Sequence, residues 1–416
     1  MTAGTSPLRT RHRPRAARRP VAALTIALAC GLGLAGPAPS AVADTRSEQW
    51  YLKAMQMEDI WKTARGEGVT VAVIDTGVNP DTPSLRGQVL KGLDATGADG
   101  DENDDYDGHG TSMAELIAGT GKSGGLQGVA PAAKILPMRV GTAEFQKAHS
   151  SNASDWADAI RAAADSDAKI ISISMGSDYA MERERAATEY ARSKGKLIFA
   201  SVGNGALQGN KEEHYPAAYP DVVGVSAADS EGAVGEFAQN GNLVDIASPG
   251  VDVPVWCDET FQKYCPEAGG TSQATAIASG SAALVWSAHP DWTANQVLNV
   301  LFDTAARDWE DGTLSKYLGH GLIRPSMNIL KGKGDPGDPD VSPLTDEKTA
   351  GAQAASPTGS APASPAAERD APAAGDTVAA DAADDGPGAG LIAGVALAVV
   401  VVVGGAVLLV RRRRGA

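Results

Sequence analysis

Four short segments of this 416-residue sequence contain residue types that together could perform nucleophilic catalysis. Asp75 ends an apolar run, His109 lies between two glycines, Asn204 follows another apolar run, and Ser272 opens a stretch of small residues. A serine hydroxyl becomes a nucleophile when an imidazole takes its proton, and a carboxylate can orient that imidazole. An amide N–H group can stabilise the negative charge that develops on a carbonyl oxygen. The four residues therefore predict acyl transfer.

Each of these residues also has a simpler interpretation when it is considered alone. Asp75 could cap a turn, His109 could be a hydrogen-bonded core histidine, and Asn204 between glycines could belong to an ordinary turn. Ser272 could serve only as a helix N-cap. The order Asp, His, amide, Ser, with each residue at the end of a strand or the start of a helix, favours the catalytic interpretation.

The elements that must position these residues follow from hydrophobic periodicity. Short apolar, β-branched runs predict strands, and longer patterns between them predict helices. The predicted strands are 69–74, 134–138, 170–174, 197–201 and 222–226, and the predicted helices are 114–118, 156–164, 181–193 and 274–287. This alternation predicts an α/β fold with a mostly parallel sheet and helices on both faces. Sites in such sheets form at the carboxyl ends of the strands, where the candidate residues lie.

At this point the sequence resembles the subtilisin-like serine peptidases, or subtilases. The resemblance covers residues 48–332 and includes, in order, VIDTGV (73–78), DGHGT (107–111), VGNG (202–205) and GTSQA (270–274). The chain order Asp, His, Ser is that of the subtilisins. The resemblance implies a subtilisin-like fold and a serine endopeptidase in which Ser272 attacks the peptide carbonyl. His109 would then transfer the proton, and Asp75 would orient His109.

The resemblance also implies roles for residues around the triad. The side chain of Asn204 and the backbone N–H of Ser272 would bind the oxyanion. Ser174, Met175 and Gly176 would pair with the substrate as an added strand and form one wall of the P1 pocket.

One position departs from the family pattern. Subtilases usually have proline where this chain has Ala276, one turn after Ser272. The substitution is either a tolerated variant or a change that alters how the acyl-enzyme partitions between water and amines.

Cys257 and Cys265 are the only cysteines after residue 43. An even pair in an exported domain favours a disulfide, whereas a metal pair would need two more ligands nearby.

The acidic stretch 99–105 offers oxygen ligands, but it lacks the glycine and the closing glutamate of a calcium-binding EF-hand loop. We predict a solvated acidic loop there, no metal and no cofactor.

Both ends of the chain carry membrane-targeting signals. Residues 1–43 combine a basic leader, an apolar run at 21–34 and Ala41-Val42-Ala43, which predicts a secretory signal peptide; a retained N-terminal anchor is the alternative. Residues 391–410 are uncharged and precede Arg411–Arg414, which predicts a single transmembrane helix and a cytoplasmic tail at 411–416. The body would therefore be extracytoplasmic, attached to the cell membrane.

Between the body and this helix, residues 333–390 are rich in Ala, Pro and Asp and contain no aromatic residue. Such a composition predicts a disordered linker. The peptidase domain is then 44–332, including a short N-terminal extension.

The formal net charge of −15 argues against nucleic acid as the main partner, because phosphate binding needs a basic surface. The arrangement of signal peptide, linker and C-terminal helix resembles that of the mycosins, membrane-anchored subtilases associated with type VII secretion in actinobacteria. We predict an endopeptidase that acts on polypeptides, with processing of secreted proteins as one expected role. The alternative is a structural component that stabilises a secretion complex, with proteolysis secondary.

Overall fold

The computed structural model describes residues 45–349, except 150–155, 210–212 and 311. The predicted signal peptide (1–43), residues 350–390 of the predicted linker, the predicted transmembrane helix (391–410) and the tail (411–416) lie outside these residues. Among the described residues, none of the helices has both the length and the apolar character needed to cross a membrane.

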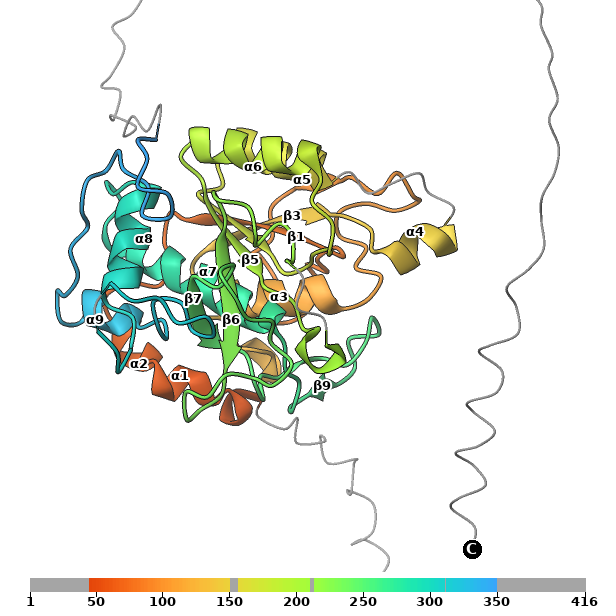
Figure 1. Cartoon of the computed structure of the whole chain (residues 1–416). Helices are drawn as coiled ribbons and strands as arrows, with labels where there is room; N and C mark the ends of the chain where they lie inside the picture. The colour runs from red at the N-terminus through yellow and green to blue at the C-terminus, as the bar shows by residue number, and fades with distance from the viewer. Residues whose placement is uncertain (1–44, 150–155, 210–212, 311, 350–416) are drawn as a thin grey trace, which may run out of the picture. The chain divides into compact units, whose positions relative to one another are not determined.

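A seven-stranded parallel sheet forms the centre of the described structure (Figure 1). Its strands are β1 (Thr70–Asp75), β2 (Leu93–Asp94), β3 (Lys134–Arg139), β4 (Ile170–Ile173), β5 (Leu197–Ser201), β6 (Val223–Ala228) and β7 (Ile246–Pro249). Their order is β2-β3-β1-β4-β5-β6-β7, and every neighbouring pair is parallel. The predicted α/β fold is confirmed. β1 lies between β3 and β4, so the chain direction across the sheet reverses beside Asp75, where ligand sites of such sheets form.

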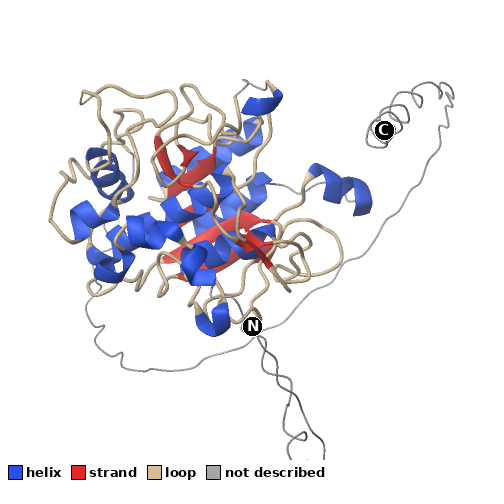
Figure 2. Ribbon diagram, turned by 90° about the horizontal axis from the view of Figure 1, so that it is seen from below, coloured by secondary structure: helices blue, strands red, loops and turns tan. Residues whose placement is uncertain are grey.

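Helices cover both faces of the sheet, as Figures 1 and 2 show. One face carries α5 (Trp156–Asp165) and α6 (Glu182–Ser193), and the other carries α3 (His109–Ala118), α7 (Thr271–Ala288) and α8 (Ala294–Asp303). The side chains of β1 alternate between the two cores: Val71 and Val73 join the α3 and α7 side, and Ala72 and Ile74 join the α5 and α6 side. Because both faces of the sheet are buried, the strand sequences are continuous apolar runs.

The helix α7 runs through the core beneath the sheet, where it contacts β4 to β7, α3 and α8. Every residue from Thr271 to Trp286 is buried. A helix that is buried all round needs no polar face, and its many Ala, Ser and Gly residues allow a close approach to its neighbours. At Gly280 an added Cβ would lie 2.9 Å from the Cβ of Val129, so this position has no room for a side chain.

The remaining elements are short. They are the 3-10 helices η1 (Thr45–Glu48), η2 (Lys122–Gly124) and η3 (Ala206–Gln208), the helices α1 (Trp50–Ala54), α2 (Met57–Ile60), α4 (Ala143–His149) and α9 (Pro325–Ile329), and the antiparallel ribbon of β8 (Val255–Trp256) and β9 (Tyr264–Cys265). The N-terminal segment is fixed to the body by buried polar contacts. The side chain of Gln49 donates to the carbonyl of Gln127 at 2.9 Å and accepts from its N–H at 2.9 Å.

Residues 333–349, which belong to the predicted linker, pack along α8. The side chain of Asn295 donates to the carbonyl of Pro339 at 2.9 Å and to the hydroxyl of Thr349 at 3.0 Å, and Asn299 donates to the carbonyl of Pro336 at 3.1 Å. Leu344 packs against the core. The ordered structure therefore extends beyond the predicted boundary at 332. Composition could not indicate this, because amide groups on α8 supply hydrogen bonds to a segment that has few apolar residues of its own.

Candidate active site

Asp75 and His109 are joined by a hydrogen bond at the carboxyl edge of the sheet. His109 begins α3, and its Nδ1 donates to Oδ1 of Asp75, the last residue of β1, at 2.7 Å. Asp75 is fully buried, while the imidazole keeps 30% of its side-chain surface exposed. The same carboxylate oxygen accepts from the backbone N–H of Thr76 at 2.8 Å. A buried carboxylate thus fixes the orientation of a ring whose other nitrogen, Nε2, is the one that can act as a base.

Charge around the imidazole determines its affinity for a proton. Burial alone would lower the pKa of His109, but the negative charges of Asp75, Asp107 and Asp105 outweigh it and raise the pKa to about 9. The site therefore stabilises the imidazolium form, which is the form that a general base adopts after accepting a proton.

Asp105 organises the turn that presents His109. One of its carboxylate oxygens accepts from the hydroxyl of Thr76 at 2.7 Å and the N–H of Gly108 at 2.8 Å, and the other accepts from the N–H of Thr111 at 2.8 Å. These bonds satisfy donors at the start of α3 and tie that helix to the end of β1.

The expectation of a solvated acidic loop at 99–105 is therefore wrong for two of its members. Asp105 and Glu102 are each only 8% exposed. The side chain of Glu102 accepts from the N–H of Gly92 at 3.1 Å, so it too has a structural partner. The sequence signal for Asp105 was its position just before a helix start, where acidic residues are common.

Ser272 lies in the first turn of α7 and is 8% exposed. Its hydroxyl donates to the carbonyl of Ser174 at 2.7 Å, and the hydroxyl of Ser174 donates back to the carbonyl of Ser272 at 3.1 Å. Because α3 and α7 pack against each other, the helices carrying His109 and Ser272 are direct neighbours. The N-terminus of a helix favours negative charge, which suits an oxygen that becomes anionic during a reaction.

The residue that departs from the family pattern, Ala276, is fully buried and continues α7 without a break. A proline here would lack the backbone N–H that alanine supplies to the first turns of the helix.

Asn204 is held beside Ser272 through the neighbouring Thr271. Its side-chain oxygen accepts from the backbone N–H of Thr271 at 2.9 Å and from the Thr271 hydroxyl at 3.0 Å. This bonding establishes which end of the amide is the acceptor and which is the donor. The preceding Gly203 has a φ of +96°, a conformation that glycine adopts without strain, and it lets the chain turn sharply after β5.

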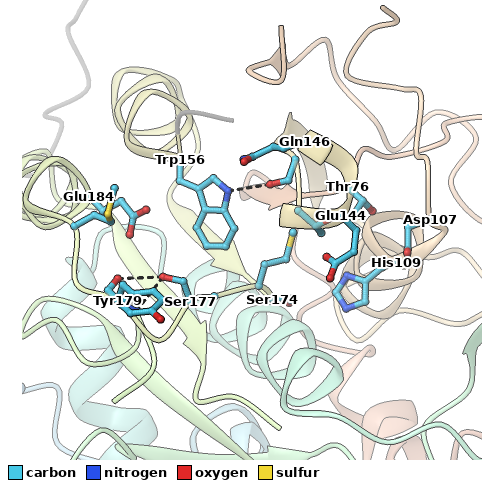
Figure 3. A pocket seen from close by; sticks show the side chains of 15 residues that line it. Thr76, Asp107, His109, Glu144, Gln146, Trp156, Ser174, Ser177, Tyr179 and Glu184 are labelled. Carbon is cyan, nitrogen blue, oxygen red and sulfur yellow. Dashed lines mark hydrogen bonds between the residues drawn. The ribbon is translucent and has the colours of Figure 1, made fainter. Parts of the chain in front are cut away.

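A cleft of about 730 Å³ opens beside these residues (Figure 3). His109 and Thr76 line one end, Ser174, Met175 and Gly176 also line the cleft, and further residues complete the wall. These further residues are Asp107, Gly141, Thr142, Glu144, Gln146, Trp156, Ser177, Tyr179, Met181 and Glu184. The predicted substrate-binding residues and the predicted base therefore share one cavity.

Ser174, Met175 and Gly176 form an extended segment that continues β4. Beyond the strand, Ser177 and Tyr215 exchange two backbone hydrogen bonds, at 2.9 and 2.8 Å. Among the described residues, the backbone groups of Met175 and Gly176 have no hydrogen-bond partner. Such an unpaired edge can accept an extended peptide as an additional strand.

Cys257 and Cys265 form a disulfide across the ribbon of β8 and β9, with their Cα atoms 5.1 Å apart. The ribbon packs against α3: the N–H of Trp256 donates to the hydroxyl of Ser112 at 3.0 Å. An added Cβ at Gly108 would lie 2.7 Å from the carbonyl oxygen of Asp258, so the loop approaches the residue before His109 closely. The disulfide-closed ribbon thus supports the helix that carries the imidazole.

Glu115 is a buried carboxyl on α3 that the sequence did not single out. It accepts from the hydroxyls of Thr82 and Tyr264, each at 2.7 Å, and so links α3 to the ribbon. Burial raises the pKa of Glu115 to about 7, although both hydroxyls act in the opposite direction. The only sequence signal was an acid within an otherwise apolar helical run.

The uncharged side chains of Ser84 and Gln127 hold the loop before Gly128. Ser84 is fully buried and donates its hydroxyl to the carbonyl of Leu126, and the side chain of Gln127 donates to the carbonyl of Gly119 at 3.2 Å. The carbonyls of Leu126 and Gly119 are thus satisfied within the protein. Within the described residues, no group of three or more His, Cys, Asp or Glu is arranged to hold a metal ion.

Comparisons with known proteins agree with this geometry. Residues 66–321 match the subtilase family model, described as the peptidase S8 family. Thermitase from Thermoactinomyces vulgaris is 34% identical over 244 residues, which cover 58% of this chain and 82% of thermitase. The solved structure of MycP3 protease from the type VII (ESX-3) secretion system is 30% identical, with a TM-score of 0.56, over 68% of this chain and 88% of MycP3.

A second solved structure, MycP1 from Mycobacterium smegmatis, is 28% identical, with a TM-score of 0.60, over 73% of this chain and 89% of MycP1. The resemblance to the mycosins that the sequence indicated is therefore confirmed. The family match covers more than half of the chain and includes Asp75, His109, Asn204 and Ser272. The chain belongs to the subtilase family and is a serine endopeptidase.

Proposed function

We propose that peptide-bond cleavage proceeds through Asp75, His109 and Ser272. The observation that carries this proposal is the 2.7 Å hydrogen bond between His109 and the buried carboxylate of Asp75. His109 lies on α3, which packs against α7, the helix that begins with Thr271 and Ser272. The hydroxyl of Ser272 attacks the substrate carbonyl, and Nε2 of His109 takes its proton and delivers it to the leaving amine. Asp75 holds the imidazole in the required tautomer and stabilises its protonated form.

We infer that Asn204 and the backbone N–H of Ser272 stabilise the tetrahedral intermediate. The two bonds from Thr271 to the Asn204 side-chain oxygen support this role, because they orient the amide so that Nδ2 is its donor end. Loss of one such donor typically costs about 2.7–4 kcal/mol of transition-state stabilisation. The substrate pairs with Met175 and Gly176 as an added strand, and Ser174 positions Ser272 through its carbonyl.

The proposed mechanism is tested with an active-site fluorophosphonate probe on the full-length protein. We expect labelling of the wild type and none of Ser272→Ala. Ser279→Ala is the matched control, because Ser279 is buried on the same helix and has no hydrogen-bond partner among the described residues. Labelling that persists in Ser272→Ala, or that is lost equally in Ser279→Ala, would contradict the assignment of the nucleophile.

We further propose that the peptidase acts outside the cytoplasm, anchored by residues 391–410, and works with an export apparatus. The signal-peptide pattern, the uncharged segment before Arg411–Arg414 and the likeness to proteases of type VII secretion systems support this. The Cys257–Cys265 disulfide is compatible with an oxidising compartment. Protease protection of the body in intact cells would contradict the orientation.

The second candidate role, as a structural component of a secretion complex, has the same likeness in its favour. Deletion of the gene and the Ser272→Ala substitution separate the two roles. If secretion stops after deletion but continues with Ser272→Ala, the structural role dominates; if both stop it, catalysis does.

A further inference from the structure

The end of the cleft that contains His109 is acidic. Asp107, in the turn before α3, and Glu144, on α4, both line the cavity there, and both are exposed. In Figure 3 they lie at the same end of the cleft as His109, whereas Tyr179 and Glu184 lie at the other end. None of the described residues that line this cavity is a lysine or an arginine.

The cations on the adjacent elements, Lys147 on α4 and Arg139 on β3, do not line the cavity. Arg139, on the adjacent β3, is buried, lies 3.6 Å from the carboxylate of Asp94 and donates to the carbonyl of Asp99. The charge of Asp107 also contributes to the raised pKa of His109, so its field reaches the reaction centre. A ligand group placed between Asp107 and Glu144 therefore meets two carboxylates and no fixed positive charge among the lining residues.

The geometry of an extended substrate decides which of its side chains reaches this position. The scissile carbonyl belongs to residue P1 and must lie at Ser272, whose hydroxyl contacts the carbonyl of Ser174. Side chains of an extended peptide alternate between opposite faces, about 3.3 Å apart along the chain. If the P1 side chain is directed away from this cavity, the alternation directs the P2 side chain into it, on the side where His109 lies.

We propose that Asp107 and Glu144 select a lysine or arginine at substrate position P2. This inference rests on the proposed proteolytic function and names the class of substrate that the same site prefers. A long basic side chain suits the cleft because its methylene groups can lie along Trp156, which forms part of the wall, while its charged end reaches the two carboxylates. The two acids come from separate elements, so each can be replaced without changing the element that carries the other.

The test measures kcat/KM for three peptides that differ only at P2, which is lysine, norleucine or glutamate. We expect lysine to be favoured over norleucine by roughly tenfold at low ionic strength, with glutamate poorest, because two partly exposed charge pairs contribute modestly each. Raising the salt concentration should reduce the ratio. The variants are Asp107→Asn, Glu144→Gln and the double variant, and Asp338→Asn is the charge-matched control on the segment beside α8.

The outcomes are separated by the ratio of kcat/KM for the lysine peptide to kcat/KM for the norleucine peptide. Effects transmitted through His109 change kcat/KM for both peptides alike, so they cancel in this ratio. A stepwise fall of the ratio toward one in the single and double variants, with Asp338→Asn unchanged, supports the proposal. Active enzyme with no preference at P2, or with a preference that the double variant retains, overturns it and leaves the proposed function intact. Absence of any Ser272-dependent turnover overturns the proposed function, and the inference with it.

Discussion

His109 holds its proton more tightly than a free histidine, and this has a measurable consequence for the pH dependence of cleavage. Only the neutral imidazole can accept the serine proton, so activity is lost as the pH falls through the pKa of His109. With that pKa raised to about 9, kcat/KM for a peptide with norleucine at P2 should rise with pH well above pH 6.5. We therefore expect kcat/KM to be highest at alkaline pH.

The variant Asp107→Asn tests whether the nearby carboxylate raises the pKa of His109. Removing a negative charge beside His109 destabilises the imidazolium, so the midpoint of the pH profile should move to lower pH. The measurement is kcat/KM against pH for the wild type and the variant. A midpoint that stays fixed would show that Asp107 does not influence the imidazole, and one that moves upward would contradict the predicted sign.

The raised pKa of Glu115 predicts that this residue makes the protein less stable as the pH rises, whereas an ordinary salt-bridged acid makes it more stable. Its pKa of about 7 in the folded protein lies above the unfolded value of 4.5, so the folded state binds more protons between these values. Stability should therefore fall as the pH rises from about 4.5 to 7, by an amount on the order of 3 kcal/mol. Glu115→Gln removes the charge and should reduce the fall by this amount, while Asp245, whose pKa burial also raises to about 7, keeps its own contribution.

Urea unfolding at several pH values measures the free energy of unfolding with Glu115 and with Glu115→Gln. Both proteins carry Ser272→Ala, which prevents self-digestion. Glu67→Gln is the control, because Glu67 is exposed and its side chain accepts only a local backbone N–H. Equal pH dependence in Glu115→Gln and the wild type would contradict the prediction.

At the scale of elements, the ribbon of β8 and β9 supports α3. It contacts this helix at Gly108 and Ser112 and, through Tyr264, at Glu115. In the Cys257→Ser/Cys265→Ser variant, a loop of about nine residues gains freedom in the unfolded chain, which costs about 2.6 kcal/mol of stability in the chain-entropy model. Because the ribbon touches the turn before His109, kcat should also fall at a temperature where the variant is folded.

The comparison that separates the two effects is Tyr264→Phe, which keeps the disulfide and removes one hydrogen bond to α3. We expect it to lose stability by about 1 kcal/mol with little change in kcat. If the double cysteine variant keeps full kcat, the ribbon has no role in positioning His109.

The elements also show which features the sequence could predict. The strands β1, β3, β4, β5 and β6 and the helices α5, α6 and α7 lie within two or three residues of their predicted positions, because continuous burial leaves a strong apolar pattern. The helix predicted at 114–118 begins five residues earlier, at His109, because Gly108, His109 and Gly110 carry no helical pattern and contacts from Asp105 fix that turn. β7 and α8 were not predicted, although α8 begins with a capping box formed by Thr293 and Gln296.

At the scale of the whole molecule, the contacts between α8 and residues 333–349 predict where the stable domain ends. A chain ending at 332 loses the partners of Asn295 and Asn299, whereas a chain ending at 349 keeps them. We expect the longer form to be more stable by about 2–3 kcal/mol, since each neutral hydrogen bond contributes about 1 kcal/mol.

Thermal and urea unfolding of residues 44–332 and 44–349, both with Ser272→Ala, provide the measurement. Asn299→Ala should weaken the longer form and leave the shorter form nearly unchanged. Identical stability of the two truncated forms would show that the segment rests on the surface without stabilising it.

The path of α7 through the middle of the fold also determines when the enzyme can become active. Asp75 and His109 lie in the first part of the domain, whereas Ser272 and the helix that fills the core come near its end. A growing polypeptide that has been synthesised only as far as residue 270 has an acid and a base but no nucleophile, and its sheet lacks the helix that covers it. Proteolysis therefore cannot begin in a product that ends before α7: synthesis of this helix supplies both the nucleophile and the core.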